Sequence, residues 1–135
     1  MKLSSKSRYG LKAMCEIACR PNEVVSIAQI ASATNTSPLY LEQLIALLRR
    51  ANLVKSIRGA GGGYMLAKPA EEISVGDILR TLEDDLEFID CISGECDNKC
   101  NCKNHVVWQK LYDAMNTALD SVKLSEIAKG GCTNG

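Results

Sequence analysis

Two helix-start signals that follow one another closely constrain the fold of this chain more than any other feature of its sequence. Ser26 is followed three residues later by Gln29, a capping box that predicts a short helix over residues 27–34. After a short turn, Ser37 stands directly before a proline, an N-cap pattern that predicts a second helix over residues 38–52. Two short helices joined by a tight turn form a helix-turn-helix motif.

The segments around this motif predict the rest of a winged helix. Residues 8–20 carry apolar side chains at helical spacing, and residues 53–58 and 64–67 have the composition of short strands. The glycine-rich loop of residues 59–63 could instead cradle a phosphate, but it lacks the Lys-Ser/Thr ending of a P-loop and precedes a strand. The loop therefore predicts a hairpin turn, and the hairpin is the wing.

Charge divides the chain into two opposite halves. Residues 1–70 contain ten basic and three acidic residues, a balance of +7, whereas residues 71–135 contain six basic and thirteen acidic residues, a balance of −7. A basic half of this kind attracts phosphate backbones, although ordinary solvated helices could also carry these charges. The division favours a nucleic-acid partner, with double-stranded DNA as the expected one.

Four of the seven cysteines and the single histidine lie together in the acidic half. Thiolate and imidazole groups at this density predict a metal site, and these ligands suit zinc, Cu(I) or an iron-sulfur cluster. The residues are Cys91, Cys96, Cys100, Cys102 and His105.

The helix predicted over residues 105–123 carries an apolar stripe that needs a partner. This stripe begins after the winged domain is complete, so we expect it to pair with the same helix of a second subunit in a homodimer. A short final turn is expected over residues 125–129. The predicted dimer residues are Trp108, Leu111, Met115, Ala118 and Val122.

The remaining cysteines and the hydropathy bear on the compartment. No apolar run approaches the roughly 20 residues of a membrane span, and no signal peptide is recognisable, so we expect a cytoplasmic protein without membrane contact. In a reducing cytoplasm, an odd number of cysteines is not a disulfide framework. We expect Cys15 and Cys19 to be buried as small apolar residues and Cys132 to lie in a loose tail.

Three stretches of the sequence resemble a known family. Residues 3–9, residues 40–44 and residues 53–64 are similar to IscR-type iron-sulfur cluster regulators, within the Rrf2 family of bacterial winged-helix transcription factors. The resemblance extends from about residue 1 to residue 128. It implies a homodimeric DNA-binding regulator that senses cluster status through a bound 2Fe-2S cluster and controls iron-sulfur cluster biogenesis genes.

The resemblance also implies which residues hold the cluster. Cys91, Cys96, Cys102 and His105 match the family's three cysteines and one histidine, with Cys100 as a possible substitute for Cys96. The spacing between the first two cysteines is one residue shorter than in most IscR-like members, so the middle ligand stays open between Cys96 and Cys100.

A further set of residues is expected to contact DNA. Glu42 and Gln43 can read base edges in the major groove, and Arg58 on the wing suits a narrow minor groove. Leu39 stands where IscR-like members have a polar residue, so the sequence preference can differ from theirs. The expected contact residues are Ser4, Lys6, Arg8, Tyr9, Ser37, Leu39, Tyr40, Glu42, Gln43, Arg58 and Gly59.

The expected architecture is mainly α with a small β-hairpin wing and a long C-terminal dimerisation helix. We assign residues 1–83 to the DNA-binding domain, 84–104 to a cluster-binding loop, 105–128 to the dimerisation helix and final turn, and 129–135 to a flexible tail. An enzyme is not expected, because no set of nucleophile, base and acid is present. The alternatives are a zinc-stabilised repressor, a repressor switched by a disulfide between Cys100 and Cys102, and a cluster carrier that does not bind DNA.

Overall fold

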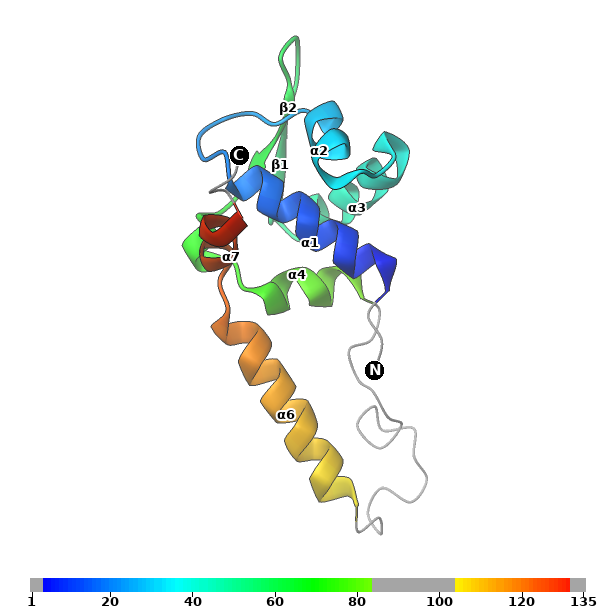
Figure 1. Ribbon diagram of the computed structural model, residues 1–135, viewed down its shortest axis with the longest axis vertical. Coiled ribbons are helices and arrows are strands. Elements are labelled where there is room, and N and C mark those ends of the chain that lie inside the picture. Colours follow the sequence, from blue (N-terminus) through cyan, green and yellow to red (C-terminus); the bar gives the residue numbers. More distant parts are fainter. Residues whose placement is uncertain (1–3, 84–103, 132–135) are drawn as a thin grey trace.

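A computed structural model of the protein describes residues 4–83 and 104–131. Figure 1 shows a cluster of helices with a two-stranded hairpin on one side and one long helix extending from the other. The fold is mainly α with a β-hairpin wing, as expected from the sequence. The elements are α1 (Ser5–Ala18), α2 (Ile27–Thr34), α3 (Pro38–Arg50), β1 (Val54–Ile57), β2 (Gly63–Leu66), the 3-10 helix η1 (Ala70–Glu72), α4 (Val75–Leu82), α6 (His105–Ser121) and α7 (Leu124–Gly131).

The helix-turn-helix motif forms through the predicted caps. The backbone N–H of Gln29 donates to the Ser26 hydroxyl at 3.1 Å, and the backbone N–H of Ser26 donates to the Gln29 side chain at 2.8 Å. After α2, Asn35 adopts the left-handed conformation with φ of 53°, which turns the chain toward α3. The Ser37 hydroxyl then accepts the backbone N–H of Tyr40 at 3.2 Å and fixes the start of α3.

The wing is an antiparallel hairpin in which Val54 pairs with Leu66 and Ile57 with Gly63. Tyr64 also exchanges two backbone hydrogen bonds with Val25, at 2.8 and 2.9 Å, so the segment before α2 pairs with the inner strand of the hairpin. This pairing requires glycine at position 63, because a Cβ there would collide with the carbonyl of Val25. The base of the wing is therefore fixed to the helix-turn-helix motif.

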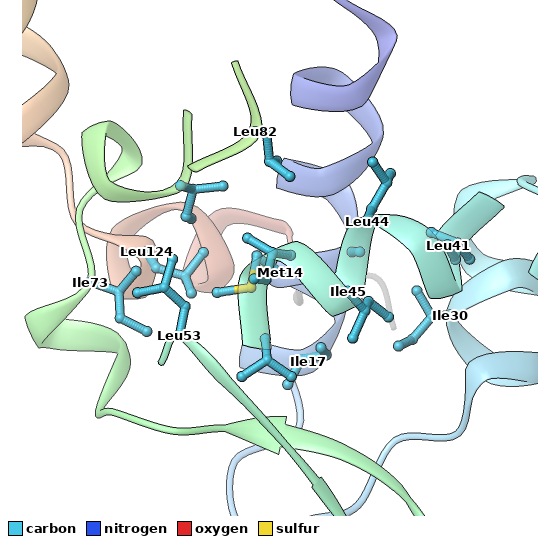
Figure 2. Packing of buried hydrophobic residues seen from close by; sticks show 14 of the residues in the cluster. Met14, Ile17, Ile30, Leu41, Leu44, Ile45, Leu53, Ile73, Leu82 and Leu124 are labelled. Atoms are coloured by element: carbon cyan, nitrogen blue, oxygen red, sulfur yellow. The ribbon is translucent and has the colours of Figure 1, made fainter. Parts of the chain in front are cut away.

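One hydrophobic core joins the helices and the base of the wing. Figure 2 shows Met14 of α1 at the centre, with Leu44 and Ile45 of α3 on one side and Leu53 and Leu124 on the other. Helices α1 and α4 approach closely at Gly10, where an added Cβ would collide with Leu82. The largest fully buried side chains are Met14, Ile17, Ile30, Leu41, Leu44, Ile45, Leu48, Ile73, Ile78, Leu82, Leu124 and Val25.

The C-terminal helices divide between two roles. Helix α6 ends at Ser121, and α7 returns to the core, where Leu124 is fully buried and its backbone N–H donates to Ile73 at 2.8 Å. The expected final turn is thus a helix that packs into the domain formed by residues 4–83, and it extends to Gly131. Helix α6 projects away from that domain (Figure 1) and has no fully buried residue.

The junction of α4 and α6 is held by a second, smaller apolar cluster and an ion pair. Val75 and Leu79 of α4 pack against partly buried side chains of α6 and of the segment that follows it, and Leu119 of α6 is one of them. Beside this cluster, the Arg80 guanidinium binds Asp120 at 2.7 Å and Asn116 at 2.8 Å. None of the helices in residues 4–83 and 104–131 is long and apolar enough to cross a membrane.

Candidate nucleic-acid interface and metal ligands

Helix α3 has one face in the core and one face open to solvent. Leu41, Leu44 and Leu48 are buried, whereas Glu42 and Gln43 are exposed. This division follows from helical spacing, because residues three and four apart share a face. The polar side chains expected to read base edges are thus free to reach a DNA groove.

The first turn of α3 presents an apolar side chain to solvent. Leu39 is 68% exposed, which is the largest value among the exposed large hydrophobic residues of the described chain. At the start of a recognition helix, an exposed aliphatic group can contact the methyl group of thymine. The Ser37 hydroxyl is also exposed, but it already accepts a backbone hydrogen bond as the N-cap of the helix.

The start of α1 is joined to the start of α3. The rings of Tyr9 and Tyr40 pack edge to face with centroids 6.2 Å apart, and the Tyr40 hydroxyl lies 3.0 Å from the hydroxyl of Ser5. Arg8 and Lys12 lie over the Tyr9 ring, at 6.0 and 5.1 Å from its centroid. These contacts place two cations near the start of α3, and only one of them, Arg8, was expected from the sequence as a DNA contact.

The end of α3 contacts the wing. The Arg49 guanidinium donates to the Ser56 hydroxyl of β1 at 3.4 Å. Arg58 and Gly59 are exposed at the tip, and Gly59 has φ of 102°, a conformation that other residues rarely adopt. The wing therefore carries an exposed cation on a turn whose backbone favours glycine.

Two other expected DNA contacts lie next to a carboxylate that sequence reasoning missed. The backbone N–H of Ser4 donates to Glu83 at 2.6 Å, and the Ser4 hydroxyl is buried, whereas Lys6 is exposed. Desolvation acts to raise the pKa of Glu83, but hydrogen bonding by Ser4 and Ser7, with a smaller contribution from the positive charge of Lys6, outweighs it and lowers that pKa. A negative charge at position 83 thus anchors the start of α1. The sequence holds no local signal for it, because the two partners are far apart in the chain.

Of the five candidate metal ligands, His105 alone falls within the described part of the chain. Cys91, Cys96, Cys100 and Cys102 lie outside the described residues. His105 is the first residue of α6, and its Nδ1 atom is buried without a hydrogen-bond partner among the described residues. A buried imidazole nitrogen without a partner costs free energy unless it finds a hydrogen-bond partner or binds a metal, so the side chain fits a ligand role.

The residues of the expected dimer seam differ in how far the described chain covers them. Met115 and Val122 pack against α4 of the same chain, and Trp108 is half-buried. Leu111 is 50% exposed and Ala118 is also exposed. A neighbouring stripe is exposed along its whole length and consists of Val107, Leu111, Ala114 and Ala118.

Comparison with known proteins identifies relatives along nearly the whole chain. Residues 3–130 match the Rrf2 family, described as iron-dependent transcriptional regulators. The regulator CymR of Bacillus subtilis is 42% identical over 129 residues, which cover 95% of this chain and 90% of CymR. The regulator IscR of Aliivibrio salmonicida is 37% identical over 129 residues, which cover 94% of this chain and 77% of IscR.

The solved structures that resemble this chain also include both CymR and IscR. The structure of CymR, the global cysteine regulator of B. subtilis, has a TM-score of 0.80 at 40% identity and covers 96% of this chain and 97% of its own. The structure of T. potens IscR has a TM-score of 0.76 at 40% identity, and it covers 96% of this chain and 88% of its own. These relatives are transcriptional regulators, not enzymes.

Proposed function

The chain belongs to the Rrf2 family of DNA-binding transcriptional regulators, and from this premise we propose that it is a homodimer whose operator affinity depends on a bound 2Fe-2S cluster. Its relatives include both CymR and IscR at similar identity, so family membership alone does not choose the signal. The choice of a cluster rests on the ligands of this chain, and above all on His105.

The DNA-binding part of the proposal is supported by the exposed face of α3. Glu42 and Gln43 would enter the major groove, with Leu39 beside them, while Arg58 on the wing would reach the adjacent minor groove. Arg8 and Lys12, which lie over the Tyr9 ring, would contact phosphates. Such a protein acts where the bacterial chromosome lies, in the cytoplasm.

The dimer is proposed to form along the exposed stripe of α6, which comprises Val107, Leu111, Ala114 and Ala118. Their spacings of four and three residues keep them on one face of a helix, and that face is exposed in the described part of the chain. Small alanine side chains would let two helices approach closely. Two winged domains held in this way would read half-sites about 34 to 36 Å apart, one turn of DNA.

We assign Cys91, Cys96, Cys102 and His105 as the ligands of the cluster, with Cys100 competing for the middle position. A cluster held in this way supplies a redox-active and labile group, whose occupancy can report iron, oxidant or cluster supply. His105 is well placed to transmit occupancy, since it opens the same helix that carries the proposed dimer stripe. A ligand bond at His105 would fix the first turn of α6, and with it the start of the dimer contact.

Anaerobic purification tests the cluster directly. We expect a coloured protein that absorbs visible light. This absorption should be lost or shifted in the variants Cys91→Ala, Cys102→Ala and His105→Ala. Zinc in the same ligands would leave the protein colourless, and a Cys100–Cys102 switch would show only a change in free thiols after mild oxidation. Cys96→Ala and Cys100→Ala, compared side by side, identify the middle ligand. A colourless protein containing neither iron nor sulfide would contradict the proposal.

A further inference from the structure

A cavity of about 650 Å³ lies on the side of the domain away from the start of α1. Its walls come from the end of α1, the strand β2, the segment through η1, and α7, which lies beside the end of α1 in Figure 1. The volume is within the range of small-molecule sites in proteins, which is about 300 to 1,000 Å³.

Four cationic side chains line this cavity, against two acidic ones. The cations are Arg20, Lys55, Lys68 and Lys129, and the acids are Glu23 and Glu71. In the described part of the chain, none of these cations forms an ion pair with a carboxylate, since the pair recorded there is Arg80 with Asp120. The cavity therefore has an uncompensated positive charge.

Arg20 is the least exposed of the four cations. Its backbone is fixed in a turn, where its N–H donates to Ile17 at 3.2 Å and its carbonyl accepts from Glu23 at 3.2 Å. The Nη1 atom of its guanidinium is buried and has no hydrogen-bond partner among the described residues. A buried guanidinium nitrogen without an acceptor is costly, and an oxyanion is the group that it binds best.

The cavity also has an apolar wall. Met65 and Leu66 of β2 are partly exposed and form this wall, with Ile17 of α1 and Ala128 of α7 buried behind its surface. A bare inorganic ion would leave this wall in contact with water. A cavity with both positive charge and an apolar wall instead suits a ligand with one negatively charged end and one apolar end.

We propose that this cavity binds a small organic oxyanion, with its phosphate or carboxylate on Arg20 and its apolar body against Met65 and Leu66. Such a ligand would contact the wing strand and α7 at the same time, and would link the wing to the C-terminal helix. The site lies at the opposite end of α1 from Arg8 and Tyr9, and His105 is not among the residues that line it.

Methionine labels make the test specific to this site. Full-length protein labelled with carbon-13 in its methionine methyl groups gives separate signals for Met65 in the cavity, Met14 in the core and Met115 on α6. Titration with phenyl phosphate and with benzoate should shift Met65 saturably and leave Met14 and Met115 unmoved. Benzyl alcohol, which has the ring without the charge, should bind at least about tenfold more weakly, as should inorganic phosphate, which lacks the ring.

Substitutions complete the test. Arg20→Ala should weaken phenyl phosphate binding about tenfold or more, whereas Lys110→Ala, an equal loss of charge on α6 outside the cavity, should leave it unchanged. If Arg20→Ala does not fold, Lys68→Ala combined with Lys129→Ala must show the loss. Unchanged binding in these cavity variants, equal binding of benzyl alcohol, or displacement of the probe from Met65 by sheared DNA would overturn the small-ligand assignment.

Discussion

Tyr9 in α1 and Tyr40 in α3 pack edge to face, with ring centroids 6.2 Å apart and ring planes at 78°. Tyr40 lies in the first turn of the recognition helix, so this contact fixes where that helix starts relative to α1. The two cations over the Tyr9 ring are positioned by the same contact. The orientation of the recognition helix and the placement of basic charge are therefore linked.

Tyr9→Ala should weaken both folding and DNA binding. Loss of the edge contact costs about 0.5 to 1.5 kcal/mol beyond the lost burial, and the cations over the ring lose their support. Urea denaturation and fluorescence anisotropy with labelled DNA measure the two effects. Tyr9→Phe, which keeps the ring, should behave like wild type in both, and a loss as large as that of Tyr9→Ala would show that the hydroxyl, not the ring, carries the effect.

Arg58→Ala should reduce operator affinity by about 1 to 3 kcal/mol, because the guanidinium is exposed at the wing tip and can reach the minor groove of DNA. Binding of the wild type should also weaken steeply with salt. Anisotropy titrations at several salt concentrations test both points. Lys110→Ala is the control, because it removes one positive charge from α6, away from the wing. If the two substitutions reduce operator affinity equally, the wing does not contact DNA.

Leu111→Glu should convert the dimer to a monomer. The side chain is 50% exposed in a single chain and lies in the proposed dimer stripe, where a carboxylate would be buried without a partner. Sedimentation velocity measures the oligomeric state. Lys110→Glu, which changes the adjacent residue off the stripe, should remain a dimer. A wild-type protein that is monomeric at micromolar concentration would contradict this role for α6.

Acid should destabilise the protein partly through Glu83. Its pKa is lower in the folded protein than in the unfolded chain, so its stabilising effect is complete above the unfolded pKa and disappears as the pH falls through the folded one. Urea denaturation at about pH 7 and about pH 4 should show a smaller difference for Glu83→Gln than for wild type. Some acid dependence should remain, because hydrogen bonding to Arg80 also lowers the pKa of Asp120. Identical pH dependence of the two proteins would contradict the role of Glu83.

The helix-turn-helix motif could be predicted because its signals are local. Ser26 and Gln29 cap α2 through atoms three residues apart, and Ser37 with the following proline starts α3 in the same way. The wing followed from strand-forming residues on both sides of a glycine-rich loop. In each case, the residues that form the structure are neighbours in the sequence.

The contacts missed by sequence reasoning join distant segments. Leu124 enters the core beside Ile73, and Tyr64 pairs with Val25, although nothing near either residue indicates its partner. In α6, periodicity predicted the apolar stripe, but which of its residues also contact α4 depends on a segment far away in the sequence. Met115 packs against α4 of the same chain, whereas Leu111 is exposed.

The central claim is that the cluster controls DNA binding, and an anaerobic operator titration tests it most directly. A DNA fragment selected by the protein from a random pool is titrated with cluster-loaded protein, with apo protein, and with His105→Ala. We predict that loaded and apo protein differ in affinity by at least about fivefold, the lower end of typical allosteric coupling, and that His105→Ala behaves like apo protein. Equal affinities of the loaded and apo forms for every selected site would contradict the claim.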